Sequence, residues 1–324
     1  MKYVIIGAGP IGAGLGGLLG LAGEEVWLID SDIDHINAIH RDGLKLTVCN
    51  GTGPDRTERI RLHAVTSADT VGVADVIILS TKSCFTRGAV ESVRKTADEN
   101  TVIISNQNGL GNTDILKEFF SPDQIAYTVV GYGGSRQSLG EIRIIASKGI
   151  VNLPVTSENP GLEKKLCIMS RALAEQGFNM TYYPQPELNR LQWQKLTANC
   201  VLNGACALTH ATIDGFFSCQ EGVELGQKIV MENCAVANAL GIPLKPEDIG
   251  MVETAVRPRI KESQRHFPSM VSDLDNCKPT ENPFLNGAVV RLGKRLGIPT
   301  PCNEVVSLLI TIAEQNYDCR KYRE

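Results

Sequence analysis

The sequence lacks the features of several protein classes. Its 324 residues carry a formal net charge of -4 with a pI near 5.8, so no basic surface for nucleic acid is indicated. There is no run of about twenty apolar residues that could cross a membrane. The chain opens on a strand-like segment rather than on a charged leader and an apolar signal core. We therefore expect a cytoplasmic protein that binds neither nucleic acid nor a membrane.

Metal-binding and redox motifs are also missing. The chain has ten cysteines, but no two form a C-x-x-C pair and no Cys/His cluster has the spacing of a zinc site. We expect no metal and interpret the cysteines as reduced, buried thiols. The sequence shows no internal repeat, low-complexity tract or long linker. Hydrophobic residues make up 43% of the sequence, which is enough to form one large core or two moderate ones. At this length, two domains are favoured over one.

The N-terminal segment carries a glycine motif directly after a short apolar run, Lys2 to Ile6. Gly7 allows a tight turn, Gly9 leaves no side chain between backbone and a pyrophosphate, and Gly12 lets the next helix pack closely on the strand. The start of that helix also attracts phosphate charge. This G-x-G-x-x-G pattern predicts a dinucleotide site formed by Gly7, Ala8, Gly9, Pro10, Ile11 and Gly12.

An acidic residue follows at the expected distance. A second apolar run over residues 25–29 ends at Asp30, eighteen positions after Gly12. A carboxylate there can accept hydrogen bonds from the adenosine ribose hydroxyls. A glycine-rich turn without a cofactor is the alternative, and the order of strand, turn, helix, strand and acid disfavours it.

In the first half of the chain, predicted strands alternate with predicted helices, as in a doubly wound sheet. Buried strands are predicted at 75–80 and 101–105, with helices at 85–99 and 113–119. Residues 44–63, with a turn at Asn50-Gly51, predict a hairpin-like excursion. An antiparallel extension at the sheet edge is expected from further strands at 125–130, 141–146 and 149–154, and the sheet region is expected to end near Tyr183.

The second half is typical of a helical bundle. Two prolines in Pro184-Gln185-Pro186 oppose both helix and strand and mark a boundary. Apolar residues at spacings of three and four then predict helices at 188–209, 221–240, 246–263, 283–296 and 303–316. The predicted fold is α/β: a Rossmann-type dinucleotide-binding domain over residues 1–184 and an all-α substrate-binding and catalytic domain over residues 185–324.

The first bundle helix carries a polar pattern. Lys195, Asn199 and Asn203 recur every four residues and therefore share one helical face. A lysine among amides can donate to a carbonyl oxygen as negative charge develops there, which ketone reduction by hydride requires. The alternative is a solvated polar face, and the residues themselves leave both interpretations open.

Further motifs follow the glycine motif along the chain. They are Thr81-Lys82, Gln107-Asn108-Gly109, Trp193-x-Lys195-Leu196-x-x-Asn199-x-x-x-Asn203, Pro268-Ser269-Met270-x-x-Asp273-Leu274, Thr280-Glu281-x-x-x-Leu285-Asn286-Gly287 and Gly297-Ile298-Pro299-Thr300-Pro301-x-Asn303. Through these motifs the chain resembles the ketopantoate reductase (2-dehydropantoate 2-reductase) family over nearly its whole length. The resemblance implies a two-domain fold of the 6-phosphogluconate-dehydrogenase type.

The resemblance implies catalytic and substrate-binding roles. Lys195 would be the general acid that protonates the substrate C2 oxygen, and Glu281 would hold Lys195 protonated through a charge-assisted hydrogen bond. Asn199 and Asn203 would contact the substrate, and the Ser269 hydroxyl would bind its carboxylate. In the alternative interpretations, Glu281 would only form an ion pair on the surface, and Ser269 would cap a helix. A structural role, bracing a helix or a loop, explains Asp273 as well as a substrate contact does. Asp273 is therefore left out of the site.

The same resemblance implies cofactor contacts. Lys82, Asn108 and Glu281 would join the glycine motif and Asp30 in the cofactor site, and Asn108 would also contact the substrate. Many family members carry an arginine near the end of the second strand, whereas this chain has Asp30-Ser31-Asp32. Because a carboxylate repels the 2'-phosphate of NADPH, Asp30 favours NADH. NADPH stays possible through Lys82 or Arg41.

The implied activity is reduction of a small 2-oxo acid, ketopantoate, to D-pantoate for coenzyme A synthesis. A homodimer is the assembly considered for the protein, because apolar bundle helices often form dimer surfaces. At position 266 the chain has His where some relatives have a substrate-contacting asparagine. An NAD-dependent D-2-hydroxyacid dehydrogenase of the D-mandelate type is therefore the first alternative. A non-catalytic NAD-binding sensor is the alternative from another class of protein.

Overall fold

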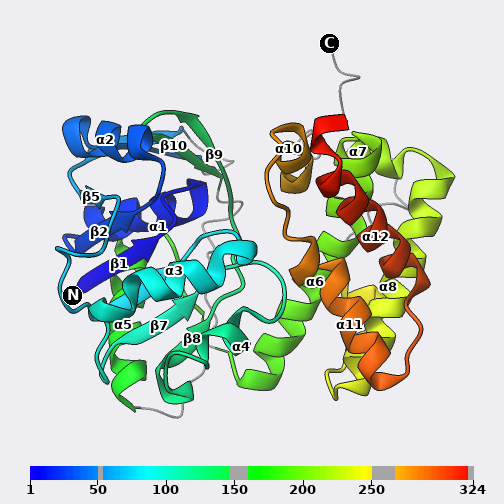
Figure 1. Cartoon of the computed structure of the whole chain (residues 1–324). Coiled ribbons are helices and arrows are strands. Elements are labelled where there is room, and N and C mark those ends of the chain that lie inside the picture. The colour runs from blue at the N-terminus through cyan, green and yellow to red at the C-terminus, as the bar shows by residue number, and fades with distance from the viewer. Residues whose placement is uncertain (50–53, 146–159, 182, 250–266, 320–324) are drawn as a thin grey trace. The chain divides into compact units, whose positions relative to one another are not determined.

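The computed structural model describes residues 1–49, 54–145, 160–181, 183–249 and 267–319 (Figure 1). The chain divides into two compact units. One unit comprises Met1–Gln107 with Asn112–Leu188, and the other comprises Asn108–Gly111 with Asn189–Glu324. We call them the sheet unit and the helical unit. The predicted turn at Asn50-Gly51, the predicted strand at 149–154 and the departure at His266 lie outside the described residues.

A six-stranded parallel sheet forms the centre of the sheet unit. Its strand order is β5-β2-β1-β6-β7-β8, with β1 next to both β2 and β6. The order reverses at β1, so the carboxyl ends of β1 and β6 border the crevice where open sheets of this type bind ligands. The strands are β1 (Lys2–Ile6), β2 (Glu25–Ile29), β5 (His63–Val65), β6 (Val76–Leu79), β7 (Val102–Ser105) and β8 (Ile125–Tyr127).

Both faces of this sheet are covered. In β1, Tyr3 and Ile5 join the core beneath one face, while Val4 and Ile6 join the core beneath the other. This alternation explains why the strand reads as a continuous apolar run. The first core includes α1 (Pro10–Leu21) and the second includes α3 (Thr86–Val93); the other helices on this part of the chain are α2 (Ile33–Asp42), α4 (Asn112–Leu116), η1 (Ser83–Phe85), η2 (Arg94–Thr96) and η3 (Pro122–Gln124).

The expected antiparallel edge extension is instead a second sheet. Its order is β4-β3-β10-β9, formed by β3 (Leu44–Cys49), β4 (Arg56–Ile60), β9 (Gly133–Ser138) and β10 (Glu141–Ile145). The predicted hairpin at 44–63 is confirmed as the antiparallel β3–β4 pair. The strand at 125–130 was expected to be antiparallel, and this was wrong, because β8 pairs in parallel with β7. Parallel pairing of β10 with β3, which are far apart in the sequence, joins the β3–β4 and β9–β10 pairs into one sheet.

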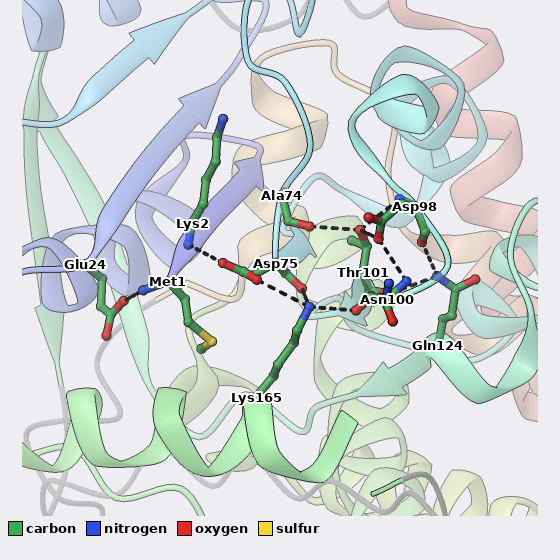
Figure 2. Close-up of polar contacts among 10 residues, drawn as sticks. All are labelled: Met1, Lys2, Glu24, Ala74, Asp75, Asp98, Asn100, Thr101, Gln124 and Lys165. Carbon is green, nitrogen blue, oxygen red and sulfur yellow. Dashed lines mark hydrogen bonds and ion pairs between the residues drawn. The ribbon is translucent and has the colours of Figure 1, made fainter. Parts of the chain in front are cut away.

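Helix α5 (Pro160–Glu175) lies in a region that the sequence analysis assigned to the sheet. Leu162, Leu166 and Met169 bury its apolar face in the sheet-unit core. Figure 2 shows how its polar side is held: Lys165 Nζ donates to Asn100 O at 2.7 Å and pairs with an Asp75 carboxylate oxygen at 3.4 Å. These contacts lie at the amino ends of β6 and β7, opposite the carboxyl-end crevice, and so have a structural role.

The helical unit is confirmed as a bundle. Its helices are α6 (Gln185–Thr209), α7 (Ile213–Phe217), α8 (Gln220–Ala239), α10 (Ser269–Asp275), α11 (Asn286–Leu296) and α12 (Pro301–Gln315), with short turns η4 (Pro246–Asp248), η6 (Asn282–Phe284) and η7 (Tyr317–Cys319). Only the start of the helix predicted at 246–263 is described, as η4. An apolar core runs through the described part of the unit and includes Trp193, Leu196 and Cys200 of α6.

The cysteines are only partly as expected. Among those whose side chains are described, all are free, and four are buried: Cys49, Cys200, Cys206 and Cys234. Cys219 and Cys277 are exposed, so the expectation of uniformly buried thiols was wrong. Nothing in their local sequence patterns predicts the difference. In the part of the chain that the structure describes, no helix is both long and apolar enough to cross a membrane.

Candidate active site

The glycine motif forms the turn between β1 and α1. Gly7 has φ of +95°, which glycine adopts without strain, and a Cβ there would lie 2.7 Å from the backbone of Ser80 and Thr81. A Cβ on Gly12 would lie 2.0 Å from Gly7 O, so only glycine allows this close approach of helix to strand. A Cβ on Gly9, by contrast, would meet nothing within 4 Å. The backbone is therefore open at the residue expected to face a pyrophosphate.

Asp30 lies beside this turn. Its Oδ2 accepts from Ala8 N at 2.7 Å, and its Oδ1 accepts from Asp32 N at 2.9 Å. These bonds fix the carboxylate at the end of β2 while leaving lone pairs on both oxygens for a ribose hydroxyl. The residues of the glycine motif and Asp30 thus come together in the sheet unit as the sequence indicated, and they fit the adenosine and pyrophosphate part of a dinucleotide.

Lys82 lies on the loop after β6, and Gln107 lies on the loop after β7. Gln107 Nε2 donates to Thr81 O at 3.0 Å and to Thr86 Oγ1 at 2.8 Å, so the two loops are bonded together. Both follow the carboxyl ends of neighbouring strands of the parallel sheet. The cofactor contact assigned to Lys82 stays a prediction.

Within the helical unit, α6 presents Lys195 and Asn199 on one side and buries Trp193, Leu196 and Cys200 on the other. Lys195 and Asn199 are partly exposed. The spacing of four residues places their side chains one above the other.

A buried amide network holds α6 in place. Asn286 Nδ2 donates to Cys200 O and to Asn303 Oδ1, each at 3.0 Å. Asn303 Nδ2 donates to Asn233 Oδ1 at 3.0 Å, and Asn233 Nδ2 donates to Thr197 Oγ1 at 3.2 Å. The network contacts α6 on both sides of Asn199 in the sequence, so it fixes the helix turn that carries the polar face.

Glu281 and Asn108 meet in the helical unit. Asn108 Nδ2 donates to Glu281 Oε2 at 3.2 Å, and Glu281 is buried. The backbone brings them together, because Leu110 N donates to Phe284 O at 2.9 Å. Gly109 has φ of +83°, and a Cβ there would lie 2.3 Å from Phe284 O, so glycine is required. Glu281 therefore does not follow the alternative of an exposed surface pair.

Surrounding protein lowers the pKa of Lys195 to about 8, because removal from water disfavours the ammonium. The nearby Glu281 carboxylate acts in the opposite direction and raises this pKa. The electrostatic influence of Glu281 has the sign that the sequence analysis expected, although desolvation outweighs it. The direct hydrogen bond between the two side chains stays a prediction.

Asn203 and Ser269 come together one helical turn further along α6. Asn203 Oδ1 accepts from Ser269 Oγ and from Met270 N, both at 3.3 Å. Ser269 is the first residue of α10, and the side chain that bonds the start of that helix belongs to Asn203. Asp273 is buried on the same short helix, and the bracing role considered for it stays a prediction.

Two residues beside the glycine turn were missed. His35 on α2 is buried and bonds Ala8 O through Nε2 at 3.0 Å. Arg136 on β9 places Nη1 2.6 Å from Asp32 Oδ2. The position of His35 five residues after Asp30 was a signal that could have been weighed. Arg136 had none, because it arrives through the unpredicted second sheet.

Arg41, considered as a possible phosphate ligand, is bonded to Asp42 at 2.7 Å. It lies at the end of α2, about 12 Å along the helix from its start next to Asp32, by the rise of an α-helix. The guanidinium of Arg136, in contrast, contacts the Asp30-Asp32 segment directly, through Asp32 Oδ2.

Comparisons with known proteins identify the family. Residues 3–158 match the model of the family described as ketopantoate reductase PanE/ApbA, and residues 187–314 match its C-terminal model. The chain belongs to the ketopantoate reductase family. It is therefore an oxidoreductase built on a Rossmann-type nicotinamide-binding fold.

Relatives of similar length support this membership. The 2-dehydropantoate 2-reductase of Streptococcus pyogenes serotype M3 is 28% identical over 97% of this chain and 98% of its own. A ternary structure of D-mandelate dehydrogenase with NADH and anilino(oxo)acetate is 25% identical with a TM-score of 0.87, over 98% of this chain and 100% of that chain. A PanE/ApbA family ketopantoate reductase from Ralstonia eutropha JMP134 is 27% identical with a TM-score of 0.84, over the same shares.

Proposed function

We propose that this member of the ketopantoate reductase family reduces ketopantoate to D-pantoate with a reduced nicotinamide cofactor, in the synthesis of coenzyme A, with Lys195 as general acid. The observation that carries the proposal is the environment of Lys195: a partly desolvated ammonium with a pKa of about 8, influenced by the Glu281 carboxylate on the same compact unit. A general acid works best when its pKa lies near the working pH.

The chain's own groups divide the work. The glycine turn and Asp30 would hold the dinucleotide, which supplies the hydride when bound. Lys195 Nζ would donate a proton to the ketone oxygen as negative charge builds on it. Asn199 and Asn203 would hold the substrate, and Ser269 would donate to its carboxylate. Asn108 fixes the Glu281 carboxylate through the bond of 3.2 Å.

The cofactor is proposed to be NADH. Asp30 is an anion at the end of β2, where NADPH would bring a phosphate. Arg136 is paired with Asp32, whose pKa it holds below the usual range. That guanidinium is therefore already paired with a carboxylate, and its presence does not overturn the preference set by Asp30.

A D-mandelate-type dehydrogenase remains the second candidate. The close structural similarity to D-mandelate dehydrogenase favours it, since that structure contains NADH, the cofactor that Asp30 favours here. Under either proposal Lys195 would serve as the general acid, and the pocket for the substrate tail would distinguish the two activities.

The test is a steady-state assay of the purified protein with NADH and NADPH against ketopantoate and phenylglyoxylate. We expect the highest kcat/KM for ketopantoate with NADH. Lys195→Ala should lower kcat by about two orders of magnitude or more, because a positioned general acid contributes that much. NADH affinity, measured separately by calorimetry, should change little.

Several outcomes would contradict the proposal. Full turnover in Lys195→Ala would remove the assigned acid. A higher kcat/KM for phenylglyoxylate would favour the second candidate, and a preference for NADPH would refute the cofactor assignment. Cofactor binding without oxidation in the presence of any 2-oxo acid would indicate a sensor. Lys228→Ala, which changes an exposed lysine paired with Glu224, is the matched control.

The molecule is also proposed to form a homodimer through α12. Val305, Leu308, Leu309 and Ile312 are all exposed, and their spacing of three and four residues places them on one face of the helix. The two acidic residues of this helix lie off that face: Glu304 pairs with Lys294, and Glu314 accepts from Thr280 N. An apolar, uncharged helix face is complementary to a second copy of itself about a twofold axis.

A further inference from the structure

His35 occupies an unusual position for a histidine. It is 1% exposed, and both ring nitrogens are bonded to backbone groups from distant parts of the sheet unit. Nε2 lies 3.0 Å from Ala8 O in the glycine turn, and Nδ1 accepts from Gly140 N at 3.0 Å in the turn between β9 and β10. Because a carbonyl oxygen can only accept, Nε2 carries the proton and Nδ1 does not.

The bond to Ala8 has a geometric consequence for the residue that follows it. A peptide group is planar and trans, so its C=O and its N–H point in opposite directions. Holding the Ala8 carbonyl toward His35 therefore turns the N–H of Gly9 away from His35. Asp30 holds the other side of Ala8, through its N–H at 2.7 Å. Ala8 is thus fixed by a side chain on each of its two peptide groups.

We propose that His35 is a positioning residue for the dinucleotide. By bonding Ala8 O, it sets the orientation of the Ala8–Gly9 peptide and keeps the open backbone at Gly9 aimed at the pyrophosphate. The bond to Gly140 fixes the ring in place and so couples the β9–β10 turn to the same site. This inference rests on the proposed function only in requiring that the chain binds a nicotinamide dinucleotide.

Two conservative variants separate the two bonds. In His35→Asn, the amide oxygen takes the place of Nδ1 and can still accept from Gly140 N, but nothing reaches Ala8 O. In His35→Gln, the amide nitrogen takes the place of Nε2 and can still donate to Ala8 O, while Gly140 N loses its partner. His35→Ala loses both bonds. Exposed His40 lies on the same helix, so His40→Asn and His40→Gln are matched controls.

The experiment measures the NADH dissociation constant of each variant by calorimetry without substrate, and the melting temperature of each variant without cofactor. We expect His35→Asn and His35→Ala to bind NADH about tenfold more weakly, as loss of a positioning hydrogen bond allows. His35→Gln should stay within about threefold of the parent, although it also loses one buried bond.

Equal affinities in His35→Asn and His35→Gln, or affinities that simply follow the melting temperatures, would overturn the proposal. If His35→Asn does not fold, the contrast of His35→Gln with His35→Ala decides the same question. A parent protein that binds NADH but reduces no 2-oxo acid would refute the proposed function and leave this inference standing on the affinities. A parent that binds neither NADH nor NADPH would refute both.

Discussion

Lys195 illustrates how the surroundings of one residue adjust its chemistry. Its ordinary pKa of 10.5 is lowered to about 8, with desolvation as the larger influence and Glu281 opposing it. A general acid must carry its proton when the reaction begins. The fraction of enzyme with a protonated Lys195 is therefore nearly complete at pH 7 and decreases by about tenfold per pH unit well above pH 8.

We therefore expect kcat/KM for 2-oxo acid reduction to fall above pH 8 in the parent. Glu281→Gln removes the negative charge that raises the lysine pKa, so the decline should begin at lower pH in that variant. The measurement is a profile of kcat/KM from pH 6 to pH 10. Glu224→Gln, at an exposed residue paired with Lys228, should leave the profile unchanged. An alkaline limb that does not move in Glu281→Gln would contradict this role of the carboxylate.

Some of the individual site residues could be predicted from the sequence, and others could not. Asp30 was found because its spacing from the glycine motif is fixed by local strand and helix geometry. Glu281 was assigned through family resemblance, since nothing local to it indicates a contact with Asn108 far away in the chain. Arg136, and the bond that fixes His35 to Gly140, could not be located because both contacts depend on the second sheet.

At the scale of whole elements, the first turn of α12 is stabilised by a residue from another helix. Glu232 on α8 accepts from Cys302 N at 2.7 Å, Asn303 N at 3.0 Å and Asn303 Nδ2 at 2.7 Å. The carboxylate thus bonds two otherwise unpaired N–H groups in the first turn and interacts favourably with the positive end of the helix dipole. Through Asn303 it also supports the amide network that holds α6.

Glu232→Gln should lower the free energy of unfolding by about 1 to 2 kcal/mol, because the charge is lost and one amide N–H would face another donor. Urea unfolding of the two proteins measures the difference. Glu304→Gln is the matched control, since Glu304 lies in the same first turn but pairs on the surface with Lys294. We expect its effect to stay below about 0.5 kcal/mol. Equal losses in both variants would refute the capping role.

Element prediction succeeded where the pattern was local. The parallel strands β1, β6 and β7 are continuous apolar runs because both of their faces are buried. Strand β9, with the sequence Gly-Gly-Ser-Arg-Gln-Ser, is exposed throughout and has no apolar alternation, so only its pairing with β10 makes it a strand. Helix α5 does carry buried residues at spacings of three and four, and that signal was overlooked.

For the whole molecule, the exposed face of α12 leads to a prediction about assembly. Leu308→Lys would place a charge in the middle of the apolar face. If two copies pair there, the variant should sediment as a monomer at a concentration where the parent is a dimer, because an unpaired buried charge is costly at an interface. Val73→Lys changes an equally exposed apolar residue on the sheet unit and should not alter the sedimentation of the parent. A parent that is monomeric at all concentrations would refute the dimer.

The loop that follows β7 contributes residues to both compact units. Gln107 completes the sheet unit, whereas Asn108–Gly111 belong to the helical unit, where Leu110 packs beside the core. A fragment begun at residue 189 would therefore lack four residues on which its own tertiary structure relies, including the amide that bonds Glu281. The linear order of the chain thus does not separate the two units, because a cut between residues 188 and 189 leaves part of the helical unit with the sheet unit.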